Sequence, residues 1–160
     1  MTFDNSRTII SFRIKMFFAT ILLIAWLVVV YAAELIKFPL LGMSDTVLTL
    51  ILVGIYLVIV FLPMVRNFQF VFFSDEGENI VFRYFFAGIV GGKKNSISIS
   101  KKTFAGYKYE KKYLGLIKSV ILHQKIGQGI ATYPPVYISA LTREQREKLL
   151  SWLNQYAPKM

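Results

Sequence analysis

The chain has 160 residues, of which 55% are hydrophobic and 18% are charged, a composition too apolar for an ordinary water-soluble domain of this size. The apolar residues are concentrated in two runs without any charged side chain, Met16–Ala33 and Thr46–Val65. This pattern excludes a purely soluble protein. The absence of cysteine excludes a disulfide scaffold, a thiolate metal site and a cysteine nucleophile.

The rest of the chain, from Arg66 onward, holds about 95 residues, which suffices for one small domain, 66–160, but not for two. It contains fifteen Lys and Arg residues against six Asp and Glu residues, so it carries nine of the ten net positive charges. The basic character of the protein therefore belongs to this domain.

The two apolar runs predict a pair of transmembrane helices, at 16–35 and 46–65, because roughly 20 apolar residues are needed to cross the hydrocarbon core of a bilayer. The short link between them contains Pro39 and Gly42, which favour a turn, so we expect an antiparallel helical hairpin. Residues 1–15 are then a cytoplasmic segment ahead of the membrane.

Basic residues near the ends of these helices predict their orientation. Four of them flank the pair on its outer sides and one lies in the link: Arg7, Arg13, Lys15 and Arg66 against Lys37. Since Lys and Arg are enriched on the cytoplasmic side, both termini should be cytoplasmic. An alternative takes residues 1–33 as a cleaved signal peptide, but the apolar run of 18 residues exceeds the usual length of about 7–15.

The predicted helices contain few polar side chains and no charge, so we expect neither a proton relay nor an ion path. Trp26, Gly54 and Tyr56 are the candidates for contacts with another helix, because small and polar residues occur at such interfaces. Ordinary lipid-facing side chains with one small packing residue are the simpler interpretation of the same three positions.

Beyond Arg66 the hydrophobic period changes from helical to two, which predicts β-strands. Glycines, prolines and polar runs separate the segments. The expected strands lie at 68–73, 80–90, 96–100, 103–109, 115–125 and 137–140. The domain should therefore have about six or seven antiparallel strands.

The last segment predicts an amphipathic helix. Thr142 and Gln145 have the spacing of a capping box, and an apolar face follows at Leu149, Trp152, Leu153 and Tyr156. That face must be buried against the strands. We therefore expect a membrane-anchored α+β chain, in which a two-helix transmembrane hairpin is followed by an antiparallel β split barrel capped by a C-terminal helix.

The stretch ISISKKTFAGYKYEKKYLGLIKSVILHQ, followed by YPPVYISALTREQREKLLSWL, resembles a bacterial pleckstrin-homology-like (PH-like) domain. In that family a strand leads into a lysine-rich hairpin, a final helix follows the last strand, and many members carry a short transmembrane hairpin ahead of the domain. The resemblance covers roughly residues 66–157 and includes no catalytic or ligand motif. It implies a PH-like barrel at the cytoplasmic face of a bacterial inner membrane.

Candidate groups for catalysis or metal binding are few. His123 is the only histidine and lies in a strand-like segment, which favours a plain sheet residue over a catalytic base. The acidic turn at 75–78 lacks the spacing of a calcium loop. Gly88, Gly91 and Gly92 lack the spacing of a phosphate-binding loop, so a hairpin turn explains them better. We therefore expect a non-enzymatic protein without a cofactor.

Lysine is the strongest remaining feature of the domain. The candidate residues for binding lipid or a partner are Lys93, Lys94, Lys101, Lys102, Lys108, Lys111 and Lys112. Each lysine near an anionic leaflet contributes about 1 kcal/mol to binding. Solubility and the protection of edge strands explain dispersed lysines equally well. Interleaved tyrosines are typical of cross-strand packing, so we do not expect a nucleic acid partner.

Two functional hypotheses follow. The first is a PH-like scaffold that docks a protein partner or an anionic membrane lipid at the cytoplasmic face. The second is a small accessory subunit of a larger inner-membrane complex for translocation, secretion or transport, in which the transmembrane helices contact a membrane-protein partner or a second copy. An enzyme, as a substrate-presenting subunit whose partner holds the catalytic groups, is the least supported.

Overall fold

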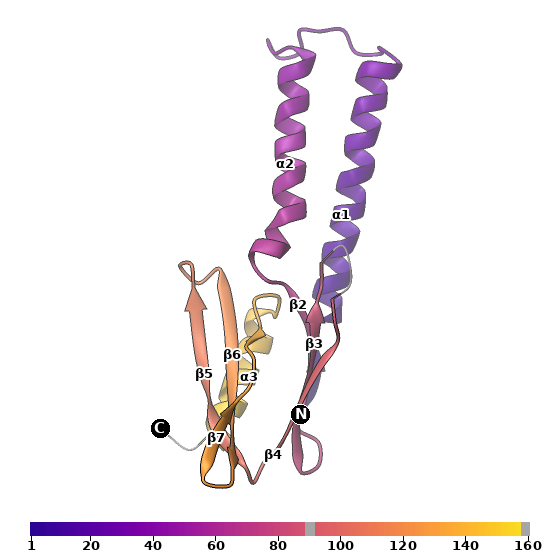
Figure 1. The fold of residues 1–160 in the computed structure, drawn as a ribbon. Helices are drawn as coiled ribbons and strands as arrows, with labels where there is room; N and C mark the ends of the chain where they lie inside the picture. Colours follow the sequence, from indigo (N-terminus) through magenta and orange to yellow (C-terminus); the bar gives the residue numbers. More distant parts are fainter. Residues whose placement is uncertain (89–91, 158–160) are drawn as a thin grey trace. The chain divides into compact units, whose positions relative to one another are not determined.

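The computed structural model describes residues 1–88 and 92–157, which form two compact units. Unit 1 comprises Met1–Ile9 and Val65–Met160, and unit 2 comprises Ile10–Met64. Two apolar helices are followed by antiparallel sheets and a C-terminal helix, so the predicted α+β class is confirmed (Figure 1).

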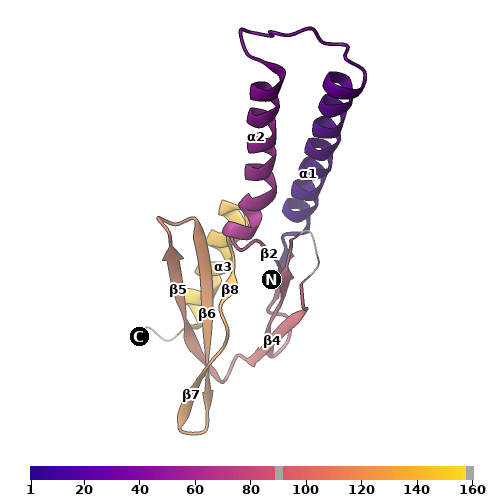
Figure 2. The same cartoon turned by 45° about the horizontal axis from the view of Figure 1, so that its top comes forward.

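Two long helices supply unit 2. Helix α1 (Ser6–Leu27) continues as a short π-helix, η1 (Val28–Ala32), and helix α2 spans Asp45–Val65 (Figure 2). Both stretches are long and apolar enough to cross a membrane, and few of their residues are buried. α2 agrees with the prediction to within one residue. α1 begins ten residues earlier than predicted, because neither glycine nor proline interrupts the chain between Ser6 and Met16.

Four strands form the first sheet of unit 1, in the order β1-β2-β3-β4, and neighbouring strands are antiparallel. Their bounds are Thr2–Asp4, Gln69–Ser74, Asn79–Phe86 and Asn95–Ser100. Buried and less buried side chains alternate along β3 and β4, as the period of two predicts. The strand predicted at 80–90 is strand up to Phe86, and its last two residues lie outside the described part of the chain.

The second sheet is built around β6, which pairs with β5, β7 and β8. The bounds are Phe104–Lys112 for β5, Ile117–Ile126 for β6, Gly129–Thr132 for β7 and Val136–Tyr137 for β8. β7 was not among the predicted segments. The strand predicted at 137–140 is wrong beyond Tyr137, because the chain turns there, with the Leu141 amide donating to the Ile138 carbonyl over 3.2 Å.

Helix α3 (Arg143–Tyr156) closes the core between the two sheets. The predicted capping box is confirmed, since the Thr142 hydroxyl accepts from the Gln145 amide and the Gln145 side chain accepts from the Thr142 amide. On the buried face, the Trp152 ring lies 5.0 Å from that of Phe73, which in turn lies 5.0 Å from that of Phe82. One core thus joins α3 to both sheets.

Strand β1 precedes α1 in the chain, yet it pairs with β2, which follows α2. The sequence placed residues 1–15 in a segment of their own, whereas three of them pair with β2. Asn5, which is 1% exposed, fixes the junction: its Oδ1 accepts from the Val71 amide over 2.8 Å and its Nδ2 donates to the Gln69 carbonyl over 2.9 Å. The chain therefore leaves the first sheet after β1 and returns to it at β2, with α1 and α2 between the two strands.

Candidate functional site

The strands of unit 1 run between two ends. We call one of them the helix end. There α2 ends at Val65, β2 begins at Gln69, and α1 begins at Ser6 just after β1. The turns between β2 and β3, β4 and β5, and β6 and β7 lie at the opposite end, which we call the far end (Figure 1). α3 runs from Gln145 at the helix end to Tyr156 at the far end.

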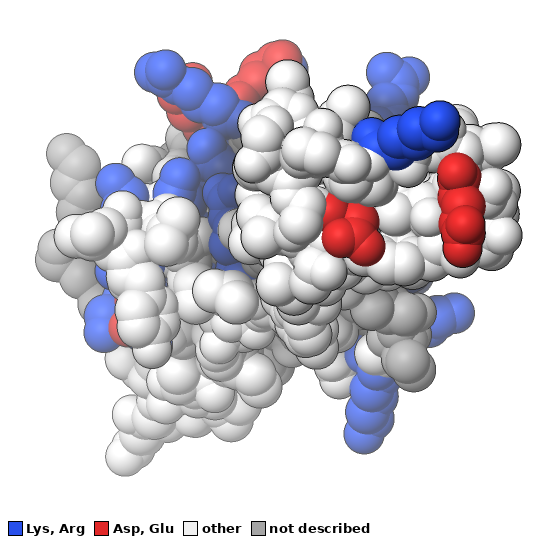
Figure 3. Space-filling view, turned by 90° about the horizontal axis from the view of Figure 1, so that it is seen from above, with Lys and Arg blue, Asp and Glu red and all other residues white. Residues whose placement is uncertain are grey.

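The seven predicted lysines do not form one surface. Lys101 and Lys102 lie in the β4–β5 turn at the far end, whereas Lys93 and Lys94 lie on the β3–β4 connection towards the helix end. The remaining three lie along β5, in the direction of the helix end: Lys108, Lys111 and Lys112. In the space-filling view of Figure 3, blue basic side chains are likewise spread over several places.

One basic residue at the far end, Lys101, bonds within the fold. The Lys101 ammonium donates to the Asp75 carbonyl over 2.6 Å and lies 5.6 Å from the centre of the Tyr156 ring. The neighbouring acid Glu76 accepts from the Thr2 hydroxyl over 2.6 Å. Positive and negative groups are therefore mixed at this end.

One face of β5 carries two lysines that share a single acid. Lys108 and Lys112 both pair with Glu110, at 2.8 Å and 3.4 Å. The hydrogen bond from Lys108, with the nearby Lys112, holds the pKa of the Glu110 carboxyl below its usual value. These exposed pairs contribute little to stability, but they neutralise part of the lysine-rich hairpin.

The other face of the same hairpin carries unbalanced charge. Lys111 stands directly opposite Lys118 in the β5–β6 register. Burial lowers the pKa of Lys118 first, and the positive charges of Arg146, Lys111 and Arg66 lower it further, in that order. No carboxylate in the described part of the chain forms an ion pair with any of these four residues, which we call the cation cluster.

Arg66 shows the same imbalance at a single atom. Its Nε is buried without a hydrogen-bond partner, while its guanidinium lies 5.3 Å from the centre of the Phe68 ring. A buried guanidinium nitrogen is normally bonded, because leaving it unpaired costs the desolvation of a charged group. The cation cluster therefore carries positive charge that no carboxylate in the described residues balances.

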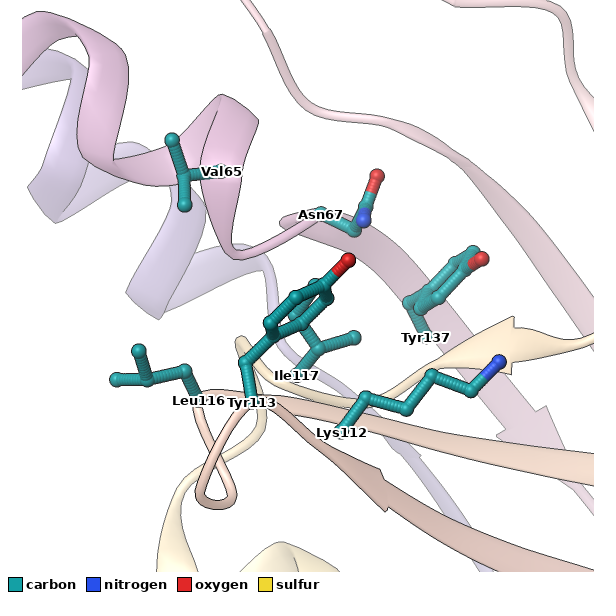
Figure 4. A pocket seen from close by; sticks show the side chains of 7 residues that line it. All are labelled: Val65, Asn67, Lys112, Tyr113, Leu116, Ile117 and Tyr137. Carbon is teal, nitrogen blue, oxygen red and sulfur yellow. The ribbon is translucent and has the colours of Figure 1, made fainter.

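A cavity of about 450 Å³ lies at the helix end, on the face of the hairpin that carries Lys112. It is lined by Val65, Asn67, Lys112, Tyr113, Leu116, Ile117 and Tyr137 (Figure 4). In the close-up, Tyr113 and Ile117 lie between Leu116 on one side and Lys112 with Tyr137 on the other. The last residue of α2 and the tip of the β5–β6 hairpin thus line the same cavity.

Two of the three predicted helix-contact residues bond within unit 2. The Trp26 indole N–H donates to the Thr49 hydroxyl over 3.0 Å, and the Tyr56 hydroxyl lies 3.2 Å from that of Thr20. These bonds link α1 to α2, so both aromatic side chains hold the helical pair together. Gly54 differs, since a Cβ atom built on it would meet nothing within 4 Å.

The histidine and the glycines considered for catalysis or phosphate binding make contacts within the fold. His123 Nδ1 lies 3.1 Å from the Thr132 hydroxyl across the β6–β7 pair. Gly88 and Gly92 lie against Phe86 so closely that a side chain at either would collide with it, while Gly91 lies outside the described residues. Within residues 1–88 and 92–157, no group of three or more His, Cys, Asp or Glu side chains could hold a metal ion.

Comparisons of the chain with models of protein families, with curated proteins and with solved structures each give no match.

Proposed function

We propose that this chain is a non-enzymatic binding module, anchored by α1 and α2 in a bacterial inner membrane, whose PH-like domain docks a protein partner or an anionic lipid at the cytoplasmic face. The observation that carries the proposal is the pairing of β1 with β2. In the chain, β1 comes before α1 and β2 comes after α2, and the two strands pair in one sheet. A chain that crosses the bilayer in α1 must therefore return through α2. The domain is then held at the membrane surface without a linker.

The strand order supports the PH-like part of the proposal. A four-stranded antiparallel sheet is followed by a sheet of β5, β6 and β7 and then by a helix that packs between them. One feature departs from the expected arrangement, in which the transmembrane hairpin precedes the whole domain. Here the first strand comes before the hairpin, so the helices are inserted into the domain between its first and second strands.

The cation cluster supports the binding part. Reversing the charge of Lys111 and Lys118 should remove it, whereas reversing Lys102 and Lys125 changes the net charge equally at the far end. The full-length chain is extracted in mild detergent, and both the retained anionic phospholipid and the co-purified proteins are measured by mass spectrometry. We expect the first pair to lower either the retained phospholipid or the co-purified proteins about 30-fold, because two lysines together contribute about 2 kcal/mol. The second pair should leave both unchanged.

Equal retention in both double variants would overturn this function. A second pair of variants, Lys111→Arg with Lys118→Arg, keeps the charge and should keep the binding. Loss of folding is recognised from the far-UV circular dichroism of each preparation, so a misfolded variant is not counted as a loss of binding.

Gly54 favours a second candidate, the accessory subunit held by its helices. Its surface on α2 is open, and neighbouring apolar side chains such as Leu50 and Val58 are exposed. A Gly54→Leu substitution fits the helical pair, yet it would block the close approach of another helix. Under this candidate, co-purification of a membrane partner is lost in Gly54→Leu and kept in the Lys111 and Lys118 variants. The reverse result favours the binding module.

A further inference from the structure

The tip of the β5–β6 hairpin has an unusual backbone. Tyr113 and Leu114 have positive φ angles of 51° and 55°, ahead of Gly115 at 86°. Two successive turns fix this shape, with the Gly115 amide donating to the Lys112 carbonyl and the Leu116 amide to the Tyr113 carbonyl, each over 3.1 Å. Tight turns with this geometry normally use Asn and Gly, so bulky apolar residues there are strained. Strain of this kind often accompanies a functional position.

The same residues are exposed to solvent. The Leu114 side chain is fully exposed, that of Tyr113 is 74% exposed and that of Leu116 is 49% exposed. Single exposed apolar residues are ordinary, but three within four positions at a hairpin tip form a continuous apolar projection. The fold itself does not use these side chains, because none of them belongs to the hydrophobic core.

The position of the tip indicates what would cover it. Tyr113 and Leu116 line one cavity with Val65, the last residue of α2. If α2 crosses a bilayer, its last residue lies at the level of the headgroups, and so does the tip beside it. Tyrosine with leucine is a common pair at this depth, where one end of the side chain meets water and the rest meets lipid.

Charge complements this position. The cation cluster lies directly behind the tip, since Lys111 and Lys118 are opposed near the end of the hairpin and Arg66 follows Val65. Phosphate groups of anionic lipids are located beside the inserted part of an interfacial segment, where Lys and Arg bind them. Apolar tip and cation cluster therefore match the two layers of an anionic membrane surface.

We propose that the hairpin tip, Tyr113–Leu116, inserts into the anionic leaflet of the bilayer that α1 and α2 cross, while Lys111, Lys118 and Arg66 bind lipid phosphates. This inference rests on the membrane anchoring in the proposed function and adds a second, independent attachment. The domain is then fixed in its orientation at the membrane, and the strained turn is stabilised by the bilayer.

The test uses the absence of cysteine from the chain. Leu114→Cys is labelled with an environment-sensitive nitrobenzoxadiazole dye, and the full-length chain is reconstituted into phosphatidylcholine vesicles with about one quarter phosphatidylglycerol. Ile130→Cys is the matched control, because Ile130 is 60% exposed at the β6–β7 tip of the same sheet, at the far end. Quenching by neutral acrylamide is compared between the two, since an anionic quencher would gather at the cation cluster.

We expect the label at position 114 to be quenched at least about threefold less than the label at 130, because an interfacial residue is withdrawn from water. Replacing Lys111 and Lys118 by Gln should raise quenching at 114 and leave 130 unchanged. Equal quenching at both positions would overturn the insertion. Protection at 114 that rises with protein density would also overturn it, because a second copy would then be covering the tip.

Failure of this inference is distinguishable from failure of the proposed function. The same vesicles are floated through a density gradient after washing with alkaline carbonate. A chain that floats with both labels equally quenched is anchored without an inserted tip, which overturns only the inference. A chain that is removed by the wash is not anchored by α1 and α2, which overturns the proposed function as well.

Discussion

The helix end and the far end of unit 1 are made from the same strands but differ in how their charges are satisfied. At the far end, Lys101 bonds to the β2–β3 turn and stacks against Tyr156. At the helix end, Lys111 and Lys118 face each other without an acid. Cross-strand pairs of like charge are destabilising, so the fold gains nothing from this arrangement. Lys111 has the Tyr109 ring beside it, at 5.5 Å, and under the proposed function the uncompensated charge at the helix end serves binding.

The apolar hairpin tips sharpen the contrast. Both the β5–β6 and the β6–β7 tips expose large aliphatic side chains, such as Leu114 and Ile130. Only the first adjoins the end of α2 and the cation cluster. Exposure alone therefore does not distinguish the two tips, and the proposed membrane contact of the β5–β6 tip rests on its neighbouring charge and on the chain connectivity.

The largest effect should come from the core that both ends share. Phe73→Ala removes a fully buried ring that packs against Phe82 and Trp152, so it should lower the free energy of unfolding by about 3–5 kcal/mol. Phe72→Ala, on the other face of β2, should cost clearly less. Thermal unfolding in detergent, followed with labels at positions 114 and 130, should show both ends melting in one transition. Two separate transitions would contradict a single core.

A smaller change in the free energy of unfolding should distinguish the two ends of strand β1. Asn5→Ala leaves the Val71 amide and the Gln69 carbonyl unpaired at the helix end, which should cost about 1–3 kcal/mol. Thr2→Ala removes only exposed hydrogen bonds at the far end of the same strand, to the Ser74 hydroxyl and the Glu76 carboxylate, and should cost less than about 0.5 kcal/mol. Both values are measured by denaturant titration of the detergent-solubilised chain. Equal costs would show that Asn5 does not fix the junction between strand and helix.

Much of the architecture was predictable because its signals are local. Helix α2 and strand β4 agree with the predicted segments to within one residue, since apolar length and strict alternation lie within each segment. The Thr142 capping box is equally local. Strand β1 was not predictable in this way, because three residues carry no periodic pattern and their partner strand lies more than 60 residues away in sequence.

The candidate site was predictable only in part. The lysine-rich hairpin is visible in the sequence, but the sequence does not show that Glu110 neutralises Lys108 and Lys112. The cation cluster includes Arg66 and Arg146, which are distant from each other and from Lys118 in the sequence. Only the fold brings their charges near Lys118. The apolar tip was also missed, because the sequence pattern favours cross-strand packing for Tyr113, whereas the structure exposes it in a turn.

The smallest expected effect is a pH dependence at the helix end. Hydrogen bonds from the Ser6 hydroxyl and then the Ser6 amide, with the charge of Arg7 adding to them, hold the pKa of Asp4 below its usual value near 3.8. A carboxyl whose pKa is lowered by folding stabilises the fold above its unfolded pKa, and this contribution is lost as the pH falls through the lower, folded value. Stability should therefore decline as the pH falls below about 4. The decline should be small, because Asp4 is exposed and solvent screens it.

The Asp4→Asn variant isolates this contribution. An asparagine side chain still accepts the bond from the Ser6 amide, so stability near neutral pH should change little, while the slope of stability against pH below about 4 should become shallower. Glu144→Gln at the start of α3 is the comparison, since Lys148 lowers the pKa of Glu144 in the same direction at a site outside the β1–α1 junction. Thermal melts between neutral and acid pH measure both. If Asp4→Asn keeps the parent slope, the bond between Asp4 and Ser6 does not hold strand β1 to the start of α1, and Asn5 alone makes that connection at the helix end.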